Sequence, residues 1–222
     1  MKPALIALIP MRHASERVAG KNYRELAGRP LYHHIVEALR ASPSVDRIVI
    51  DTDSDWIRDD AASAFPDVTV VERPLHLRDG AISMNDVLLN DVERLPAELY
   101  LQTHSTNPRL RAETIERAIT SFRTSRDSYD SLFGVTRLQT RLWTADGRAI
   151  NHDPNVLLRT QDLPPVFEEN SCLYIFDGDM LRRRRNRIGE RPLLFEVPRD
   201  EALDIDDEFD WQVVAGLSEP RS

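Results

Sequence analysis

A segment close to the N-terminus concentrates side chains that could bind a multiply charged anion. It reads PMRHASERVAGKN over residues 10–22 and follows a short apolar run. Its candidate ligand-binding residues are the cations Arg12, Arg17 and Lys21, the hydroxyl of Ser15 and the sterically undemanding Gly20. Backbone amides and two or three cations in one loop can neutralise a nucleoside triphosphate. Composition alone also fits an ordinary solvated basic loop, and taken by itself it favours that interpretation.

A pair of carboxylates near the C-terminus could bind a divalent cation. In the extended segment Asp204-Ile205-Asp206, the two acidic side chains would share one face while Ile205 pointed into the core. Mg²⁺ is bound by one or two carboxylates together with phosphate oxygens and water. The competing interpretation is a helix N-terminus, where acidic residues are favourable. We predict metal binding for Asp204 and Asp206 and helix capping for Asp207.

The other polar residues carry weaker signals. The sequence has no H-E-x-x-H pattern, and its single cysteine excludes a C-x-x-C pair, so a zinc site is not expected. His104 could contact a ligand, although a structural role is favoured. Asp51 and Asp53 are predicted to form an Asx turn. The arginine run at 182–185 is predicted to lie on a solvated helix face, with a substrate or subunit contact as the alternative.

Composition places these residues in an ordinary globular protein. The chain has 222 residues, 41% hydrophobic and 30% charged, which suits one α/β domain with a small appendage. A formal net charge of −8 disfavours nucleic acid as a partner. No apolar stretch approaches the ~20 residues that cross a bilayer, and the lone Cys172 allows no intramolecular disulfide. We therefore expect a soluble cytoplasmic protein with no membrane or nucleic-acid partner.

Strand and helix patterns alternate through the first 125 residues. Strands are expected at residues 4–9, with Pro10 ending the first, and at 46–51, 68–72 and 98–103. Helices are expected at residues 31–40, 55–64, 83–94 and 111–124. This alternation is typical of a Rossmann-like, mostly parallel sheet with helices on both faces. Because such sheets bind ligands beyond the carboxyl ends of their strands, the site is expected in residues 12–22, 51–53 and 102–107.

The pattern changes after residue 128. Strand or hairpin character is found at residues 129–137, 141–145, 156–160, 171–176 and 192–197, and a final helix is expected at 207–217. Apolar residues between 138 and 157 could form either a dimer surface or a small local core. No repeat or linker divides the sequence. We predict a single domain, 1–222, in which about 138–170 forms a small β-rich extension.

The order of these motifs resembles the acylneuraminate cytidylyltransferases, which make CMP-sialic acid and related CMP-sugar acids. The matching segments are R-x-x-S-x-R-x-x-G-K-N from Arg12, L-x-G-R-P-L from Leu26, DRIVIDTD at 46–53, Arg73-Pro74 with Asp79 and Ser83, Leu101-Gln102 with 106–108, and LDIDDEFD at 203–210. The resemblance spans nearly the whole chain. It implies a fold of the nucleotide-diphospho-sugar transferase type. It also implies a homodimer in which the 138–170 extension builds the interface and helps complete the neighbouring sugar site.

The resemblance implies roles for individual residues. Catalytic residues would be Arg12, Lys21 and Asp206. Nucleotide-binding residues would be Arg12, Ser15, Lys21, Asn22, Ser83 and Gln102, with Asn22 touching the cytosine. Sugar-binding residues would be Arg159 and Asn170. The ligands of a Mg²⁺ cofactor would be Asp204 and Asp206.

The sugar-binding part departs from the family pattern. Where sialic acid synthetases carry approximately F-R-P-N-G-A, this chain reads FEENSC over residues 167–172. Asn170 keeps its place, but Glu168 and Glu169 replace a basic residue and a proline. Two acids would repel a carboxylate unless they point elsewhere or bind an amino group. The loop 103–107 is also longer, so we expect a sugar other than ordinary sialic acid.

These observations predict a Mg²⁺-dependent cytidylyltransferase. Its substrates would be CTP and a 2-keto sugar acid, and its products a CMP-sugar and pyrophosphate. One alternative is a nucleotidyltransferase that uses a sugar 1-phosphate or another nucleoside triphosphate. A second is a catalytically idle nucleotide-binding member of the same fold. A metal-dependent glycosyltransferase is disfavoured, because its acidic pair would usually follow a strand in the middle of the sheet.

Overall fold

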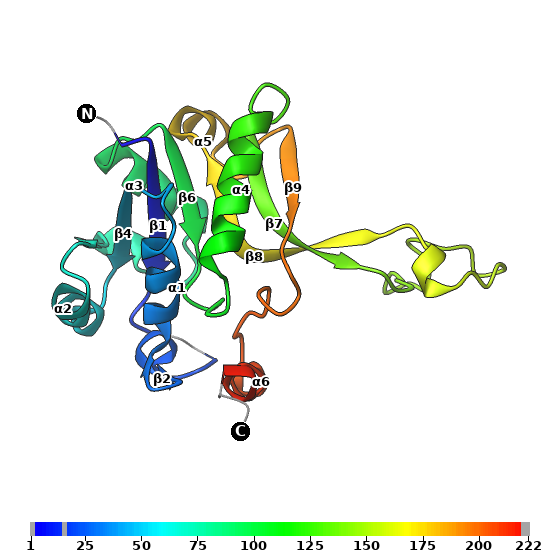
Figure 1. Ribbon diagram of the computed structural model, residues 1–222, viewed down its shortest axis with the longest axis horizontal. Coiled ribbons are helices and arrows are strands. Elements are labelled where there is room, and N and C mark those ends of the chain that lie inside the picture. Colours follow the sequence, from blue (N-terminus) through cyan, green and yellow to red (C-terminus); the bar gives the residue numbers. More distant parts are fainter. Residues whose placement is uncertain (1–2, 15–16, 219–222) are drawn as a thin grey trace.

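The computed structural model describes residues 3–14 and 17–218, which form a seven-stranded sheet with helices on both faces (Figure 1). The sheet contains β1 (Leu5–Met11), β4 (Arg47–Thr52), β5 (Thr69–Glu72), β6 (Leu99–Thr103), β7 (Ser131–Leu138), β8 (Val166–Phe176) and β9 (Pro192–Glu196). The helices are α1 (Leu31–Arg40), α2 (Asp55–Ala64), α3 (Met84–Arg94), α4 (Ala112–Ser125), α5 (Gly178–Arg184) and α6 (Glu208–Ser218). The smaller elements are a ribbon of β2 (Glu25–Leu26) and β3 (Arg29–Pro30) and the 3₁₀ turns η1 (Lys21–Tyr23), η2 (Leu75–Leu77) and η3 (Thr160–Asp162). None of the described helices combines the length and apolar character needed to cross a bilayer.

The order of the strands creates a binding crevice. The sheet runs β5-β4-β1-β6-β8-β7-β9, and every strand except β8 points in the same direction. The chain adds β4 and β5 on one side of β1 and then returns to add β6 on the other side. At such a switch in strand order the loops diverge and leave a crevice at the carboxyl ends of the strands. The expected Rossmann-like, mostly parallel sheet is confirmed.

Strand β1 lies in the middle of the sheet because both of its faces are apolar. Leu5, Ala7 and Ile9 pack against residues of α1, α2 and α4. Ile6 and Leu8 point the opposite way and pack against α3 and α5. A continuous apolar run is typical of a parallel strand that is covered on both faces. The apolar clusters on its two faces hold β1 in place and so fix where the loop that follows β1 begins.

Pro10 does not end the first strand, contrary to the sequence-based expectation. Strand β1 continues to Met11, and Pro10 is in register with Asp51 of β4. The pairing of β1 with β6 stops at Leu8. Beyond that point β1 pairs only with β4. A proline there, which has no N–H group, therefore interrupts no hydrogen bonds to a strand on the other side.

A long arm projects from the sheet (Figure 1). It consists of the distal halves of β7 and β8 and of residues 139–165 between them. The register of β7 and β8 shifts between Phe133 and Val135, near the place where the arm leaves the body. Strand β8 begins at Val166, earlier than expected, because its first residues pair only with β7 in this arm.

The tip of the arm differs from the expected hairpins. No strand forms at 141–145 or 156–160: in residues 139–165, all described, the expected hairpin is reduced to an isolated antiparallel bridge between Trp143 and Ala149, and η3 follows it. Side chains here are largely exposed, with Leu157 at 89% exposure. Apolar residues that have nothing to pack against give no reason for strand pairing.

The C-terminal helix α6 returns to the loop that follows β1. It contributes to a separate apolar cluster formed by Val18, Leu26, Leu31, Ile205, Trp211 and Val214. The guanidinium of Arg24 lies 4.1 Å from the ring centroid of Trp211 and donates to Glu208 at 2.6 Å. These contacts bring the acidic segment 203–210 to the basic loop 10–22, from opposite ends of the chain.

Candidate active site

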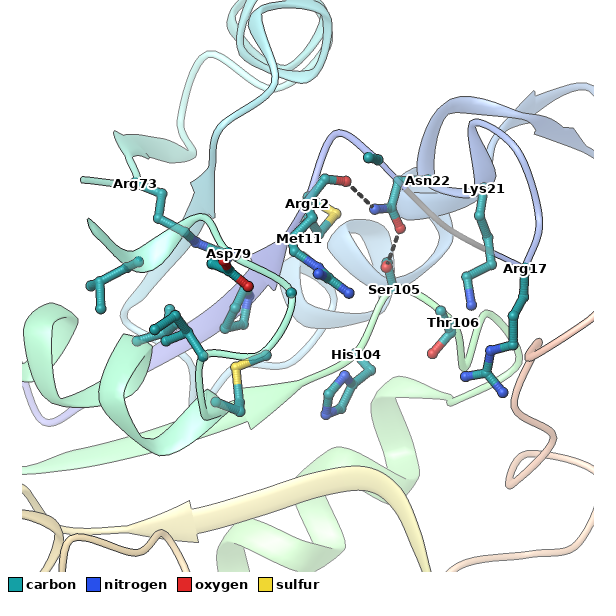
Figure 2. Close-up of a pocket in the computed structure, with 17 residues that line it drawn as sticks. Met11, Arg12, Arg17, Lys21, Asn22, Arg73, Asp79, His104, Ser105 and Thr106 are labelled. Carbon is teal, nitrogen blue, oxygen red and sulfur yellow. Dashed lines mark hydrogen bonds between the residues drawn. The ribbon is translucent and has the colours of Figure 1, made fainter. Parts of the chain in front are cut away.

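A cavity of about 400 Å³ lies at the switch point, among the loops that follow β1, β5 and β6 (Figure 2). Its polar lining residues are Arg12, Arg17, Lys21, Asn22, Arg73, Asp79, His104, Ser105 and Thr106. Cations outnumber the one acidic side chain among them, so the wall suits an anionic ligand. Pockets of this size accommodate small molecules. Of the three segments expected at the site, 12–22 and 102–107 meet at this cavity, whereas residues 51–53 do not line it.

Arg12 and Lys21 contribute cations from the loop after β1. Within the described part of the chain, the guanidinium of Arg12 has no hydrogen-bond acceptor, which leaves it free for a ligand. Lys21 Nζ donates to the carbonyl oxygen of Ile205 at 2.5 Å. Burial lowers the pKa of Lys21, while the neighbouring Asp204 and Asp206 act to raise it. Lys21 therefore joins the basic loop to the acidic segment.

Asn22 holds the two loops of the cavity together. Its Nδ2 donates to the carbonyl oxygen of Arg12 at 2.9 Å, and its Oδ1 accepts from Ser105 Oγ at 2.7 Å (Figure 2). The side chain is buried. Asn22 thus fixes the position of Arg12 relative to the end of β6. Any contact of Asn22 with cytosine would have to use its remaining hydrogen-bonding capacity.

The turn before Lys21 requires glycine. Gly20 has φ of 62° in the left-handed region and precedes η1. A Cβ at Gly20 would lie 2.5 Å from a ring carbon of Tyr23. Tyr23 stacks on His13, whose backbone N–H donates to Asp53 Oδ1 at 2.7 Å. The loop is therefore shaped by its own glycine and tied to the end of β4.

The acidic segment 203–206 lies against the loop after β6. The backbone N–H of Ile205 donates to the carbonyl oxygen of Thr106 at 2.9 Å, and Asn107 Nδ2 donates to that of Leu203 at 3.3 Å. The prediction that Ile205 points into the core is confirmed, because its side chain is fully buried. Backbone contacts therefore fix Asp204 and Asp206 on either side of this anchor.

Asp204 and Asp206 have different surroundings. Burial raises the pKa of Asp204, partly offset by a hydrogen bond from Thr106, and its Oδ1 is buried without a partner among the described residues. Asp206 is half exposed and accepts from Arg17 at 2.7 Å. Asp207 Oδ1 accepts from the backbone N–H groups of Phe209 and Asp210, so its predicted capping role is confirmed.

The donor set around Asp204 fits Mg²⁺ better than a metal that requires a full protein cage. The described residues contain no group of three or more His, Cys, Asp or Glu side chains arranged around a common metal position. Mg²⁺ needs only one or two carboxylates when phosphate oxygens and water supply the rest. An orphaned carboxylate oxygen on Asp204, beside the cationic cavity, is consistent with that division.

Arg73 reaches the cavity from a buried carboxylate pair. Its Nε donates to Asp51 Oδ1, and its Nη2 donates to the carbonyl oxygen of Asp51 at 3.3 Å. Asp91 of α3 is also fully buried, and burial with the adjacent Asp51 raises its pKa to about 8. The predicted Asx turn at Asp51 and Asp53 was wrong: Asp51 instead pairs with Arg73, and Asp53 holds the loop at His13.

A second polar cluster lies behind the end of β6. Gln102 is fully buried, where its Oε1 accepts from Arg187 Nη1 at 2.6 Å and its Nε2 lies 2.8 Å from His104 Nε2. Arg187 also lies over the ring of Tyr174, 3.6 Å from its centroid. Sequence inspection missed Arg187, because it follows the arginine run 182–185, whose side chains are exposed as expected.

Several predicted site residues lie outside the cavity wall. Ser83 caps α3 by accepting from Asn85 N at 3.2 Å, between the lining residues Ile82 and Met84. Gln102 does not line the cavity, but its Nε2 lies 2.8 Å from His104 Nε2, and His104 does line it. Asn170 bonds to Thr136 and to the backbone of Cys172. Arg159 lies in the arm and pairs with Asp162 at 2.6 Å. Ser15 lies outside the described residues.

Comparison with known proteins identifies the family to which this architecture corresponds. A family model described as Cytidylyltransferase matches residues 6–202. The CMP-N,N'-diacetyllegionaminic acid synthase of Legionella pneumophila is 28% identical and covers 97% of this chain and 96% of its own length. The N-acylneuraminate cytidylyltransferase of Streptococcus agalactiae is 26% identical over 97% of this chain. This chain spans 53% of that longer relative.

Solved structures share the fold. A CMP:2-keto-3-deoxy-manno-octonic acid synthetase in complex with CTP superposes with a TM-score of 0.71 at 17% identity, covering 96% of this chain and 97% of that one. A 4-diphosphocytidyl-2C-methyl-D-erythritol synthase superposes with a TM-score of 0.69 at 19% identity, covering 98% and 100%. The seven-stranded sheet with its switch point is therefore common to these molecules.

Proposed function

Because the chain belongs to the cytidylyltransferase family, we propose that it transfers the CMP unit of CTP to a 2-keto sugar acid of the sialic acid type. The relatives named for legionaminic acid and N-acylneuraminate support this class of acceptor. Their identities of 28% and 26% support the class and not an individual sugar. The products are a CMP-sugar acid and pyrophosphate.

One observation carries this proposal: the cationic cavity at the strand-order switch, next to a carboxylate pair. Arg12, Arg17 and Lys21 provide positive charge within a single loop, as a triphosphate requires. Asp204 and Asp206 stand beside them. This combination favours phosphoryl chemistry over simple binding of a neutral sugar, which would gain nothing from the charges.

The reaction is an in-line displacement at the α-phosphorus. The anomeric hydroxyl oxygen of the sugar acid forms a bond to this phosphorus as the bond to the bridging oxygen of pyrophosphate breaks. The hydroxyl proton passes to water, and pyrophosphate leaves with the bonding electron pair. Catalysis of this kind depends chiefly on positioning and on stabilising charge.

The residues of the cavity supply both requirements. The Arg12 guanidinium binds the phosphates and stabilises the charge that develops on them. Asn22 holds the backbone of Arg12 in place through a hydrogen bond to its carbonyl oxygen. Lys21 does the same from its place beside the acidic segment. Gly20 and the buried cluster around Val18 hold the loop in the shape that presents these cations.

Asp204 and Asp206 are the proposed residues for Mg²⁺. When bound, this ion would supply positive charge for the phosphate oxygens of CTP. The unpartnered oxygen of Asp204 supports this assignment, and Asp206 would exchange its contact with Arg17 for the ion. Mg²⁺ binding can be tested without turnover by measuring the affinity for CTP with and without Mg²⁺.

The acceptor site is proposed to include a second copy of the chain. Exposed apolar side chains on the arm are Trp143, Ile150, Val156, Leu157, Leu158 and Phe167. Several exposed apolar side chains on one projecting arm favour burial in an interface. The arm of one copy would then bring Arg159 towards the cavity of the other, where a guanidinium suits a carboxylate. Asn170 would contribute from the base of the arm.

A pyrophosphate-release screen tests the proposed reaction. Each of the four nucleoside triphosphates is paired with 2-keto sugar acids and with sugar 1-phosphates, with and without Mg²⁺. We expect release only from CTP with a 2-keto sugar acid, and only with Mg²⁺. Release from a sugar 1-phosphate or from another nucleotide would establish a different nucleotidyltransferase. A thermal shift with CTP but no release across a broad panel of acceptors would identify a non-catalytic nucleotide-binding protein.

A further inference from the structure

A chain of three polar side chains leads from the loop after α5 to the wall of the cavity. Arg187 Nη1 donates to Gln102 Oε1 at 2.6 Å, and Gln102 Nε2 lies 2.8 Å from His104 Nε2. Gln102 is fully buried and sits between the other two. Only His104 lines the cavity. The direction of hydrogen bonding along this chain determines what His104 can offer to a ligand.

The orientation of the Gln102 amide is set from two sides. A guanidinium is only a donor, so the atom of Gln102 that faces Arg187 must be the carbonyl oxygen. The amide nitrogen also lies 3.3 Å from the carbonyl oxygen of Thr103, an acceptor. A flipped amide would place N–H against N–H at one end and oxygen against oxygen at the other. The amide nitrogen therefore faces His104.

The orientation of Gln102 fixes the tautomer of His104. Because the Gln102 amide nitrogen is a donor, His104 Nε2 must accept, and the ring proton of the neutral imidazole lies on Nδ1. Burial, together with the charges of Arg187 and Lys21, lowers the pKa of His104 to about 3. The geometry favours the same neutral form, because a protonated ring would place N–H against N–H between His104 Nε2 and Gln102 Nε2.

The place of His104 indicates which substrate it serves. The cations that suit a triphosphate lie on the loop after β1. His104 follows β6, on a different loop, and its supporting residue Gln102 is paired in register with Leu8 of β1 and with Tyr174 of β8. His104 also lies in the loop 103–107, which is longer than in the sialic acid pattern. Because the proposed function assigns the triphosphate to the cations of the β1 loop, the donor on the β6 loop is the one left for the acceptor.

We propose that Arg187 and Gln102 lock His104 as a neutral Nδ1–H donor that binds an oxygen of the acceptor sugar acid. His104 is the residue that touches the substrate, and Arg187 and Gln102 are positioning residues that act through it. The choice of acceptor rests on the proposed function. The locked tautomer does not, because it follows from contacts within the protein.

A tautomer measurement tests the lock without any substrate. Two-bond ¹H–¹⁵N correlation spectra of histidine-labelled protein distinguish a protonated ring nitrogen from an unprotonated one. We expect His104 to carry its proton on Nδ1 and to stay neutral from pH 8 to about 4. His104→Asn identifies the signal by its disappearance. A proton on Nε2, or titration near the ordinary pKa of about 6.5, would overturn the proposal.

Gln102→Glu should reverse the tautomer. A carboxylate of the same shape can still accept from Arg187, but its second oxygen can only accept from His104. His104 Nε2 should then become protonated in the same spectra. If Nε2 stays unprotonated in Gln102→Glu, the orientation argument is wrong. Thermal melting reports whether the variant is folded. Arg187→Met is a second variant that weakens the lock, because it removes the donor that faces the Gln102 carbonyl oxygen.

Kinetics test the role of the donor. His104→Leu should lower kcat/KM for the acceptor by about 10- to 100-fold, because a hydrogen bond to a charged oxygen is lost. The Kd for CTP should change by less than about twofold. His104→Asn, whose amide can stand near Nδ1, should recover most of the loss. An equal loss in CTP affinity, or no loss in either quantity, would contradict the assignment to the acceptor.

A double-mutant cycle separates positioning from general packing. Arg187→Met should lower kcat/KM in the wild-type background and have little further effect in His104→Leu. The control is Arg183→Met, because Arg183 is an exposed arginine of α5. Additive effects of Arg187→Met and His104→Leu would show that Arg187 does not act through His104. If the acceptor screen itself fails, the spectra still decide the lock.

Discussion

Lys21 is surrounded by groups that act on its charge in opposite directions. Burial lowers its pKa, and Asp204 and Asp206 counteract this. Under the proposed function, these carboxylates would hold a metal ion on the same phosphates that Lys21 binds. Removal of any member of this group should therefore affect the reacting phosphates more than the fold, because Lys21 and Asp206 contribute little to the apolar core.

The first prediction concerns Lys21 and Asp206. Lys21→Ala and Asp206→Asn should each lower kcat by about 100- to 1,000-fold, as expected when a charge-stabilising group is lost. Thermal unfolding should change little. The matched controls are Arg40→Ala and Asp67→Asn, which break an exposed ion pair away from the cavity. Wild-type turnover in the purified Lys21 or Asp206 variant would contradict the assigned roles.

The second prediction concerns the buried carboxylate Asp91. Its pKa is raised to about 8, so the folded state holds a proton that the unfolded state releases above about pH 4. The free energy of unfolding should therefore fall as pH rises from about 4 to about 8. Asp91→Asn keeps a neutral donor in this place and should remove that part of the slope.

Denaturant unfolding at pH 6 and pH 9 measures this effect. Between pH 6 and pH 9, the unfolding free energy of Asp91→Asn should rise relative to that of the wild type by on the order of 1–3 kcal/mol. Asp55→Asn, on an exposed side chain, serves as the control. A difference that is constant with pH would show that Asp91 is already ionised in the folded protein.

At the scale of single residues, sequence reasoning succeeded where the relevant partners are close in the chain. Ile205 as an apolar anchor and Asp207 as a cap follow from local spacing, and both were predicted. The lock on His104 and the pairing of Arg73 with Asp51 were not. Gln102 and Arg187 are 85 residues apart, so their contact depends on how the whole sheet is assembled.

Among the elements, the turn at η1 sets the geometry of the basic loop. Gly20→Ala would force a left-handed backbone on a residue with Cβ and press that atom against the Tyr23 ring. We expect a loss of about 1–2 kcal/mol of stability and a several-fold weaker affinity for CTP. Calorimetric unfolding and CTP titration measure the two effects.

The control for the glycine prediction is Gly147→Ala. Gly147 also has positive φ, but nothing lies within 4 Å of its would-be Cβ, and it is in the arm. Its substitution should cost a similar backbone strain without affecting CTP. Equal losses of CTP affinity in both variants would indicate a general destabilisation and remove the specific role of the η1 turn.

Element positions were predictable where apolar spacing reflects burial on the sheet. The expected helices at 31–40 and 55–64 coincide with α1 and α2. The arm was not predictable in detail. Its apolar residues are exposed, so their spacing does not follow from packing against a core of this chain. Pro10 misled in a different way, since the end of the β1–β6 pairing, a tertiary feature, decides whether a proline can be tolerated.

For the whole molecule, the arm makes the oligomeric state a functional question. Arg159 belongs to residues 139–165 of the arm, which projects from the sheet (Figure 1), and it does not line the cavity of its own chain. A homodimer that completes the acceptor site would explain both this separation and the exposed apolar side chains.

Leu157→Asp together with Trp143→Ser should then produce a monomer in light-scattering chromatography, with loss of activity but retained CTP binding.

Mixing two inactive variants tests whether one copy serves the other. Lys21→Ala disables the cavity, and Arg159→Ala disables the arm. If sites are shared between copies, mixed dimers contain one site with both residues intact, and about a quarter of the wild-type activity should return. No recovery, with exchange of subunits verified by mass, would place each complete site within one chain.

The central claim is that the product is a sugar acid joined to cytidine through a single phosphate. The most direct measurement is the ³¹P spectrum of a reaction containing the protein, CTP, Mg²⁺ and N-acylated 2-keto sugar acids. We predict that the triphosphate signals are replaced by one phosphodiester signal and an equal amount of pyrophosphate. CTP left unchanged with every sugar acid, or a diphosphate-linked product in a parallel reaction that contains a sugar 1-phosphate instead, would contradict the claim.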